Sequence, residues 1–332
     1  MSKVLIIGGS GVISSHTHAA LVAQGADLAI FRRKVTPDTG TRIFVGDRHD
    51  DDALRTALDS FRPEVVIDFV CFNRIEASAL VAVLPTSVAQ VVFVSTVDVY
   101  GLPLTKLPMV ESSAWSPTSS PYATEKLATE LALKDQLMAR GVALTIVRPT
   151  FSAGRGFVIS IFDRSARPLI ARLRQGLPVP IPASPPDGSL HGWIHASDAA
   201  DTGRMVALTA GSPLAMNRDY TVGSPNTPMT HLNYVSRIAK AVGVEPKVVM
   251  IPRDFLDNHP SVPADCLFRE QTRFDLWHSM DRFLGDFPDF RPAKDIDSCL
   301  RSYVEAMDQS KFQPGKPDLE GQIIDAWRSA QA

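Results

Sequence analysis

The stretch Val4-Leu5-Ile6-Ile7-Gly8-Gly9-Ser10-Gly11-Val12-Ile13-Ser14 joins a short apolar run to a helical pattern. The run predicts a buried strand that ends at Gly8, and the pattern predicts a helix over about 12–24, closed by Gly25. Gly8 permits a tight turn, and Gly11 lets the backbone approach a pyrophosphate that faces the N–H groups of the helix start. The stretch therefore predicts a dinucleotide-binding loop, whose contacts we assign to Gly8, Ser10, Gly11, Val12 and Ile13.

Further apolar runs alternate with helical patterns along the first half of the chain. Strands are expected at 28–31, 43–45, 64–70, 91–94 and 144–147, and helices at about 50–60, 75–84 and 121–140. Strands that are apolar throughout are buried on both faces, as in a parallel sheet covered by helices. The repeated units predict an α/β fold with a Rossmann-type, doubly wound parallel sheet.

The pattern changes after residue 150. Prolines are frequent over 176–188, which predicts a loop or an edge strand, because proline cannot donate a ladder hydrogen bond. A helix over about 196–209, a strand at 220–222 and a helix over about 230–242 follow, and loops and short helices are expected after them. We expect a nucleotide-binding domain over 1–165 and a smaller mixed α/β substrate lobe over 166–332. Segments near 190–225 are expected to return to the first domain.

The composition of the 332 residues is that of an ordinary globular protein, with 45% hydrophobic and 21% charged residues. A formal net charge of −2 does not favour a phosphate backbone as a partner, so no nucleic acid is expected. Three distant cysteines argue against a disulfide framework, and the histidines show no metal-ligand spacing. No apolar run approaches the ~20 residues of a membrane span, and no signal-peptide pattern is present. These features favour a cytoplasmic protein without a metal or a membrane anchor.

The end of the second expected strand bears on the choice between NAD and NADP. An acid there binds the ribose 2′-hydroxyl of NAD, whereas arginine accommodates the 2′-phosphate of NADP. Arg32, Arg33 and Lys34 stand there with no acid before Asp38, which favours NADP. NAD with a solvated basic turn is the alternative. Three residues after other strands are also assigned to the cofactor site: Asp47, Arg48 and Cys71.

Tyr122 and Lys126 lie four residues apart in the longest expected helix, so they share one face. A phenol titrates at about pH 10, and a nearby ammonium group lowers its pKa by favouring the phenolate. Tyr122 would then take a proton from a substrate hydroxyl, while Lys126 also holds the nicotinamide ribose. Thr96, at the end of an expected strand, is placed to hydrogen-bond the reacting oxygen, although a cap of the strand end is the alternative.

Together these motifs resemble the extended short-chain dehydrogenase/reductase family, the NAD(P)-dependent epimerase/dehydratase group. The resemblance covers most of the chain and rests on 8–13, Ser95-Thr96, Val99-Tyr100-Gly101, Tyr122-Ala123-Thr124-Glu125-Lys126, Val147-Arg148-Pro149, Trp193-Ile194-His195-Ala196-Ser197-Asp198 and Tyr220-Thr221-Val222-Gly223. It implies that Tyr122 is the catalytic acid and base, that Lys126 lowers its pKa and that Thr96 binds the reacting oxygen. It also implies that Pro149 lies along the nicotinamide and that the helices at 75–84 and 121–140 form a homodimer.

Several positions depart from the pattern of this family. Ser14 replaces the last glycine of the loop, so the helix should pack slightly farther from the strand. Val97 stands where the 4,6-dehydratases carry an acid, and Asp98 stands where a base would sit, unless it is a solvent-facing acid. His191 replaces an arginine that often grips a diphosphate, and no asparagine follows the strand at 144–147. We assign four residues to substrate binding: Tyr100, Arg155, His191 and Trp193.

The leading prediction is an enzyme that oxidises a carbinol of a sugar or nucleotide-sugar to a transient ketone, as an epimerase or dehydratase does. If Asp98 is a base, it allows epimerisation beside the ketone or dehydration. One alternative is an NADPH-dependent reductase of a small ketone or aldehyde, which Arg32 and Arg33 favour. Another is a non-catalytic scaffold or RNA-binding relative, against which the Tyr122 and Lys126 pair argues.

Overall fold

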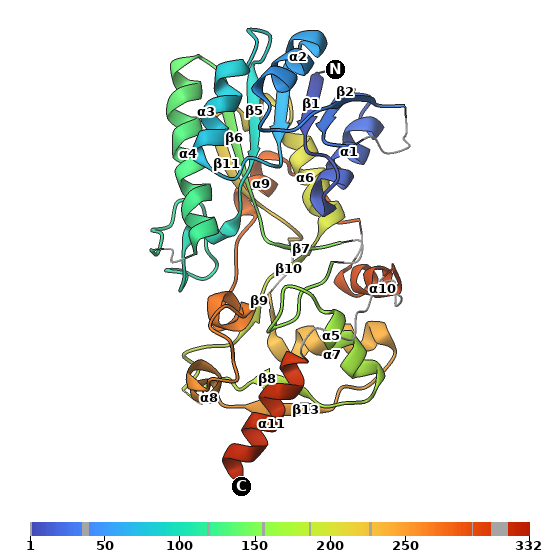
Figure 1. Ribbon diagram of the computed structural model, residues 1–332, viewed down its shortest axis with the longest axis vertical. Helices are drawn as coiled ribbons and strands as arrows, with labels where there is room; N and C mark the ends of the chain where they lie inside the picture. The colour runs from blue at the N-terminus through green and yellow to red at the C-terminus, as the bar shows by residue number, and fades with distance from the viewer. Residues whose placement is uncertain are drawn as a thin grey trace.

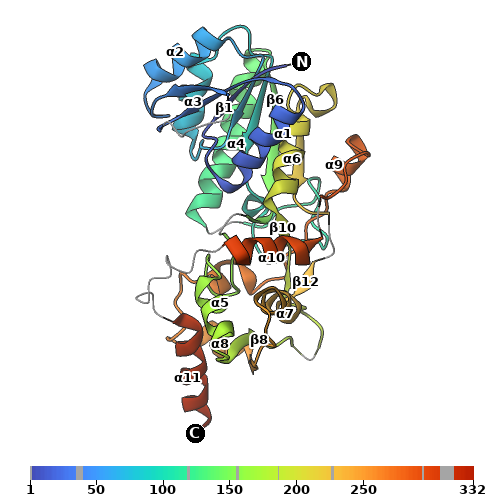
Figure 2. The same cartoon turned by 90° about the vertical axis from the view of Figure 1, so that its right-hand side faces the viewer.

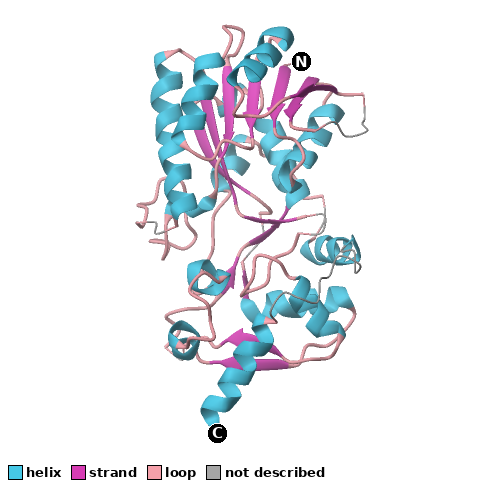
Figure 3. Ribbon diagram, in the orientation of Figure 1, coloured by secondary structure: helices cyan, strands magenta, loops and turns pink. Residues whose placement is uncertain are grey.

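Seven strands form one parallel sheet in the order β11-β6-β5-β4-β1-β2-β3 (Figure 3). The computed structural model describes residues 2–34, 40–117, 120–154, 157–185, 187–225, 228–293, 295–306 and 318–332. The strands are β1 (Lys3–Ile7), β2 (Asp27–Arg32), β3 (Arg42–Val45), β4 (Val65–Asp68), β5 (Gln90–Val94), β6 (Ala143–Pro149) and β11 (Arg218–Val222). The predicted Rossmann-type, doubly wound sheet is confirmed.

Helices cover both faces of the sheet (Figure 2). One layer holds α2 (Asp51–Phe61), α3 (Arg74–Val83) and α4 (Pro121–Ala139), and the other holds α1 (Val12–Ala23) and α6 (Ala199–Thr209). Leu5 and Ile7 of β1 pack in the first layer, and Val4 and Ile6 pack in the second. Successive side chains of a strand point to opposite faces, so a strand covered on both sides is apolar throughout.

The starts of three helices follow from their own sequence. Ser120 caps α4 through its side chain, and Pro121 takes the first helical position, where its missing N–H has no partner to lose. Asp50 caps α2 and Asn73 caps α3 in the same way. The side chains of α4 are therefore set in register with the ends of β5 and β6.

A second hydrophobic core lies beyond the carboxyl ends of the strands (Figure 1). It is built from β8 (Val179–Pro182), β13 (Val248–Ile251), α5 (Arg167–Arg174), α7 (His231–Val242), α8 (Arg253–Asn258), α10 (Ile296–Ala306) and α11 (Leu319–Gln331). The prolines of β8 lie in a strand that pairs with β13 alone, as expected of an edge. Val158 and Phe162, which precede residue 166, also pack in this core.

Three elements late in the chain return to the sheet domain. They are α6, β11 and α9 (Asp281–Asp286), whose Phe283 packs edge-to-face on Tyr220 at a centroid distance of 5.6 Å. The return of α9 had no signal in the sequence. Helix α6 begins at Ala199 and not at about 196, because β10 (Ala196–Asp198) pairs with β7 (Phe151–Ala153) and Asp198 caps the helix.

Short elements connect the lobes at the strand ends. Besides β7 and β10, a two-residue strand β9 (Trp193–Ile194) pairs with β12 (Met229–Thr230). No helix among the described residues has the length and apolar character that a membrane span requires. Within the same residues, no group of three His, Cys, Asp or Glu side chains is arranged to hold a metal ion. In open α/β sheets, ligands bind at the carboxyl ends of the strands, which here face the second lobe.

Candidate active site

Three cavities follow one another along the carboxyl ends of the strands. The outer cavity, about 450 Å³, lies at the ends of β1, β2 and β3 and is lined by Arg32 and Arg33. The central cavity, about 500 Å³, extends from the glycine loop to α4. The inner cavity, about 350 Å³, lies between the end of β5 and the second lobe. The outer and central cavities share Gly8 and Ser10, and the central and inner cavities share Tyr122, so the three are contiguous.

The glycine loop leaves its backbone open towards the central cavity. Gly8 and Gly9 have φ of 107° and 87°, and a Cβ at Gly9 would lie 2.8 Å from Ile30 Cγ2. A Cβ at Gly11 would meet only Ser14 Oγ, at 3.4 Å. The Ser14 hydroxyl accepts a hydrogen bond from Gly11 N at 2.8 Å and donates one to Gly11 O at 3.2 Å. The Ser14 side chain therefore stabilises the backbone of the loop at Gly11. The side of Gly11 that faces the central cavity stays open to an anion.

Arg48 lines the outer cavity, but its guanidinium group makes hydrogen bonds to other residues of the protein. Its Nη2 donates to Asp68 Oδ2 at 2.9 Å and to Glu76 O at 3.0 Å, and its Nε donates to Val70 O at 3.2 Å. Asp47, on the same cavity, accepts hydrogen bonds from His49. Arg48 thus ties the ends of β3 and β4 to α3, a structural role that the sequence did not indicate.

Tyr122, Lys126 and Thr96 all line the central cavity, together with the glycine loop. Lys126 is only 2% exposed, and its Nζ donates to Val94 O at 2.7 Å and to Cys71 O at 2.9 Å. Burial lowers the pKa of Lys126 to about 8. Burial, reinforced by the negative charge of Asp98, raises the pKa of Tyr122 to about 12. The expected lowering of the pKa of Tyr122 by Lys126 is not seen here, because burial and the charge of Asp98 outweigh the nearby cations.

Cys71 contributes its backbone and not its thiol to this region. Its carbonyl oxygen is one of the two acceptors of Lys126, while its side chain is fully buried. Burial raises the pKa of the Cys71 thiol to about 12, so the group stays protonated at neutral pH. Cys71 is therefore a packing residue behind the central cavity. Its neighbour Phe72 lines that cavity.

The inner cavity joins the end of β5 to the second lobe. Thr96 Oγ1 accepts a hydrogen bond from Asp98 N at 3.2 Å, which leaves the O–H of Thr96 able to donate. Asp98 Oδ2 accepts a hydrogen bond from Gln271 Nε2 at 3.1 Å, and burial raises the pKa of Asp98. Arg164 of the second lobe completes the lining. Sequence reasoning missed Gln271 and Arg164, which lie far from the recognised motifs.

The profile of the NAD dependent epimerase/dehydratase family matches residues 4–223. The chain belongs to this family. A UDP-glucose 4-epimerase of Azospirillum brasilense is 27% identical over 356 aligned positions, which cover 95% of both proteins. A 2′-dehydrokanamycin reductase of Streptomyces kanamyceticus is 31% identical over 131 residues, 39% of this chain and 36% of that protein. The UDP-glucose 4-epimerase of Thermus thermophilus, solved in complex with NAD, has a TM-score of 0.67 at 22% identity and shares the fold over 92% of this chain and 98% of that one. The resemblance to the extended short-chain dehydrogenase/reductase enzymes is confirmed.

The cavities of this epimerase/dehydratase family member fit a nicotinamide dinucleotide. The open backbone at Gly11 and the start of α1 suit a pyrophosphate, and the outer cavity suits the adenosine end. The central cavity places Pro149 on the same wall as Tyr122 and Lys126, where the nicotinamide end would lie. The residues that would hold the group therefore come from the ends of β1, β2 and β6 and from α4.

Three of the four residues assigned to substrate binding lie elsewhere. Tyr100 is buried, and its hydroxyl is bonded to Thr221 Oγ1 at 2.8 Å and to Arg148 at 3.2 Å, so the ring packs inside the sheet domain. The rings of His191 and Trp193 contact each other in a tilted arrangement at a centroid distance of 4.4 Å, and neither residue lines any of the three cavities. Arg155 lies outside the described residues. The described residues thus bring Tyr122, Lys126 and Thr96 to the glycine loop, whereas Tyr100, His191 and Trp193 line none of the three cavities.

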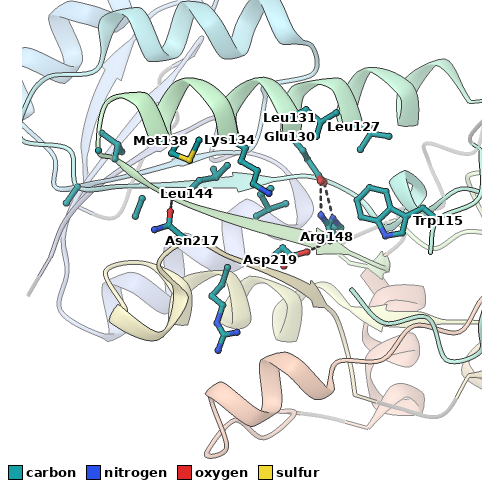
Figure 4. Close-up of a pocket in the computed structure, with 16 residues that line it drawn as sticks. Trp115, Leu127, Glu130, Leu131, Lys134, Met138, Leu144, Arg148, Asn217 and Asp219 are labelled. Carbon is teal, nitrogen blue, oxygen red and sulfur yellow. Dashed lines mark hydrogen bonds and ion pairs between the residues drawn. The ribbon is translucent and has the colours of Figure 1, made fainter. Parts of the chain in front are cut away.

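A larger cavity, about 680 Å³, lies apart from this site between α4, β6 and β11 (Figure 4). Leu127, Leu131 and Met138 of α4 form its apolar wall. At one end Arg148 pairs with Glu130 and Asp219, as the dashed lines in Figure 4 show. None of the residues that the sequence assigned to the site lines this cavity, so its size does not bear on the chemistry.

Proposed function

We propose that this chain oxidises a carbinol of a sugar or nucleotide-sugar to a transient ketone and then reduces it, as an NAD(P)-dependent enzyme of the epimerase or dehydratase type. One observation carries this proposal. Tyr122, Lys126 and Thr96 line the same cavity as the glycine loop. The residues for proton transfer therefore lie next to the expected dinucleotide site. The resemblance of the whole chain to a UDP-glucose 4-epimerase supports it.

The three side chains divide the chemistry between them. A nicotinamide held beside Pro149 would supply the hydride acceptor for the carbinol carbon and the hydride donor for the ketone. Tyr122 exchanges a proton with the substrate oxygen, and its raised pKa keeps the phenol protonated and ready to donate at neutral pH. Thr96 donates its free O–H to the same oxygen and so fixes its position. Lys126 lines the same cavity with its amine held by Val94 O, and its role here is to hold the nicotinamide ribose.

A net reductase is the second candidate, and two observations favour it. Arg32, Arg33 and Lys34 line the outer cavity, and the 2′-dehydrokanamycin reductase is similar to part of the chain. Denaturing the purified protein and analysing the supernatant separates the candidates. An enzyme that restores its own cofactor releases a retained dinucleotide. A reductase releases none and consumes NADPH steadily with a ketone, and that result would overturn the epimerase assignment.

We propose NADP as the preferred cofactor, and Arg32→Ala tests this preference. Arg32 ends β2 and lines the outer cavity, where a 2′-phosphate would lie. Loss of a charged hydrogen bond should raise the Kd for NADP about tenfold to a hundredfold and change the Kd for NAD little. Fluorescence titration with both dinucleotides measures the two constants.

Arg55→Ala is the matched control for Arg32→Ala. Arg55 is exposed on α2 and does not line the outer cavity, so both Kd values should stay unchanged. Equal weakening of NAD and NADP by Arg32→Ala would show that Arg32 does not read the 2′ group. An unchanged NADP affinity would refute the preference itself.

We propose a homodimer that forms through α3 and α4. Ile75 of α3 and Leu131 and Met138 of α4 are large apolar side chains exposed to solvent, Met138 at 73%. Clustered apolar surface of this kind marks an association site. Met138→Glu should therefore weaken the dimer at least ~10-fold, as measured by analytical ultracentrifugation. Met250→Glu, at an exposed position on β13, should leave the dimer intact, and a monomeric wild type would refute the interface.

A further inference from the structure

Gln271 reaches the inner cavity from the second lobe and carries an unused acceptor. Its side chain is 6% exposed, and its Nε2 donates to Asp98 Oδ2. Its Oε1 is buried and has no hydrogen-bond partner among the described residues. Leaving a buried acceptor without a donor is unfavourable, and a ligand that supplies an N–H or O–H to Gln271 Oε1 would relieve this cost.

The position of Gln271 is fixed by the core of the second lobe. Gln271 lies in a π-helical turn, Phe268–Thr272, a type of turn that is frequent at functional sites. Phe268 packs on Phe162 at a centroid distance of 5.5 Å, and Thr272 Oγ1 donates to Ile161 O at 2.7 Å. Anchors on both sides hold the amide of Gln271 against Asp98 across the junction of the lobes.

The charges around the inner cavity are not those of a diphosphate site. Arg164 is its one cationic lining residue among those described, and it already pairs with Glu270. Asp98 faces the same space as an acid. A diphosphate is bound by several charged donors, and the described lining supplies one such side chain, Arg164.

The size of the inner cavity points to a small substrate. Its volume of about 350 Å³ is near the lower end of the range of about 300–1,000 Å³ for small-molecule sites. Beyond Asp98 and Gln271 the space narrows to about 20 Å³, closed by Leu102, Leu104 and Leu276. The inner cavity has room for a sugar ring, and the narrow space beyond Asp98 and Gln271 does not admit a nucleotide.

We propose that Gln271 and Asp98 together bind a hydroxyl group of a small uncharged sugar next to the reacting carbon, and that this site does not take the diphosphate of a nucleotide-sugar. This inference rests on the proposed function and narrows its substrate class. Gln271 Oε1 accepts a hydrogen bond from the sugar hydroxyl. Asp98 lines the same space, and its carboxyl group accepts a second hydrogen bond from the sugar.

Equilibrium binding to the dinucleotide-loaded protein tests this inference without requiring turnover. The probes are methyl β-galactoside and UDP, each titrated by calorimetry and then in competition. The glycoside should bind saturably, and UDP should not displace it. Gln271→Met, which keeps the volume but removes the amide, should raise the Kd for the glycoside about fivefold to tenfold. Gln322→Met, on α11 and away from the inner cavity, should change nothing.

Several outcomes would overturn this inference. They are displacement of the glycoside by UDP, no glycoside binding by the wild type, or equal binding by Gln271→Met. If Gln271→Met does not fold, Gln271→Leu replaces it, because leucine also lacks the amide and should weaken glycoside binding by a similar factor. Equal binding by Gln271→Leu would count against the acceptor role. Failure of the proposed function would show instead as absent dinucleotide binding or as normal turnover without the Tyr122 hydroxyl.

Discussion

Tyr122→Phe should lower turnover at least ~100-fold and leave the Kd for the dinucleotide unchanged. General acid–base catalysis typically contributes about 10²–10⁴-fold, and this substitution removes the only atom of Tyr122 that exchanges a proton. A 100-fold loss corresponds to about 2.7 kcal/mol of transition-state stabilisation. The ring itself remains, so the wall of the central cavity that it shares with Lys126 keeps its shape.

Single-turnover oxidation of a carbinol by loaded enzyme, followed at the absorbance of the reduced nicotinamide, measures this loss. Tyr234→Phe is the matched control, because it removes a buried hydroxyl that donates to Ile159 O at 2.9 Å in the second lobe. That control should cost about 1 kcal/mol of stability and leave turnover within about twofold. Near-normal turnover of Tyr122→Phe would remove Tyr122 from the mechanism.

The same measurement has an expected pH dependence. The pKa of Tyr122 is raised to about 12, so only a small fraction is phenolate at neutral pH. The phenolate is the base in carbinol oxidation, and below the pKa its fraction rises about tenfold for each unit of pH. Oxidation by the wild type should therefore accelerate with rising pH, and Tyr122→Phe should lose this dependence. A flat wild-type profile would mean that another group accepts the proton.

Most of the sheet domain could be predicted because its signals are local. Apolar runs, the glycine loop and the Ser120-Pro121 cap each act within a few residues of the element that they define. The predictions fail where contacts between residues far apart in the sequence determine the local structure. Residues 196–198 form a strand and not a helix because β7, at 151–153, lies beside them. The return of α9 depends on the contact between Phe283 and Tyr220, which no local pattern encodes.

The residues of the candidate site also differ in whether local sequence or distant contacts place them. Tyr122 and Lys126 share one helix face, so their spacing alone brings them to one cavity. Tyr100 follows the same strand as Thr96, but its hydroxyl group accepts a hydrogen bond from Arg148. The ring therefore packs inside the sheet domain and not against the cavities. Gln271 lies 173 residues from the acid that it binds, and no spacing or composition marks it.

Arg148→Met should lower the free energy of unfolding by about 3–5 kcal/mol, because it leaves a buried carboxylate without its partner. Arg148 is 3% exposed and grips Glu130 with two hydrogen bonds, from Nε at 3.0 Å and from Nη2 at 2.8 Å. Its Nη1 reaches Asp219 Oδ2 at 2.7 Å (Figure 4). This ion pair joins α4, β6 and β11, so its loss should loosen the helix that carries Tyr122.

Urea unfolding followed by tryptophan fluorescence measures this effect, since the Arg148 guanidinium carbon lies 4.9 Å from the centre of the Trp115 ring. Arg218→Met is the control, because its pair with Asp286 is half exposed and should contribute less than about 1 kcal/mol. The double variant Arg148→Met with Glu130→Leu should recover much of the loss, because it removes the unpaired charge and fills the space with apolar atoms. If the double variant is less stable than Arg148→Met alone, the cost comes from packing around the guanidinium group and not from the isolated carboxylate.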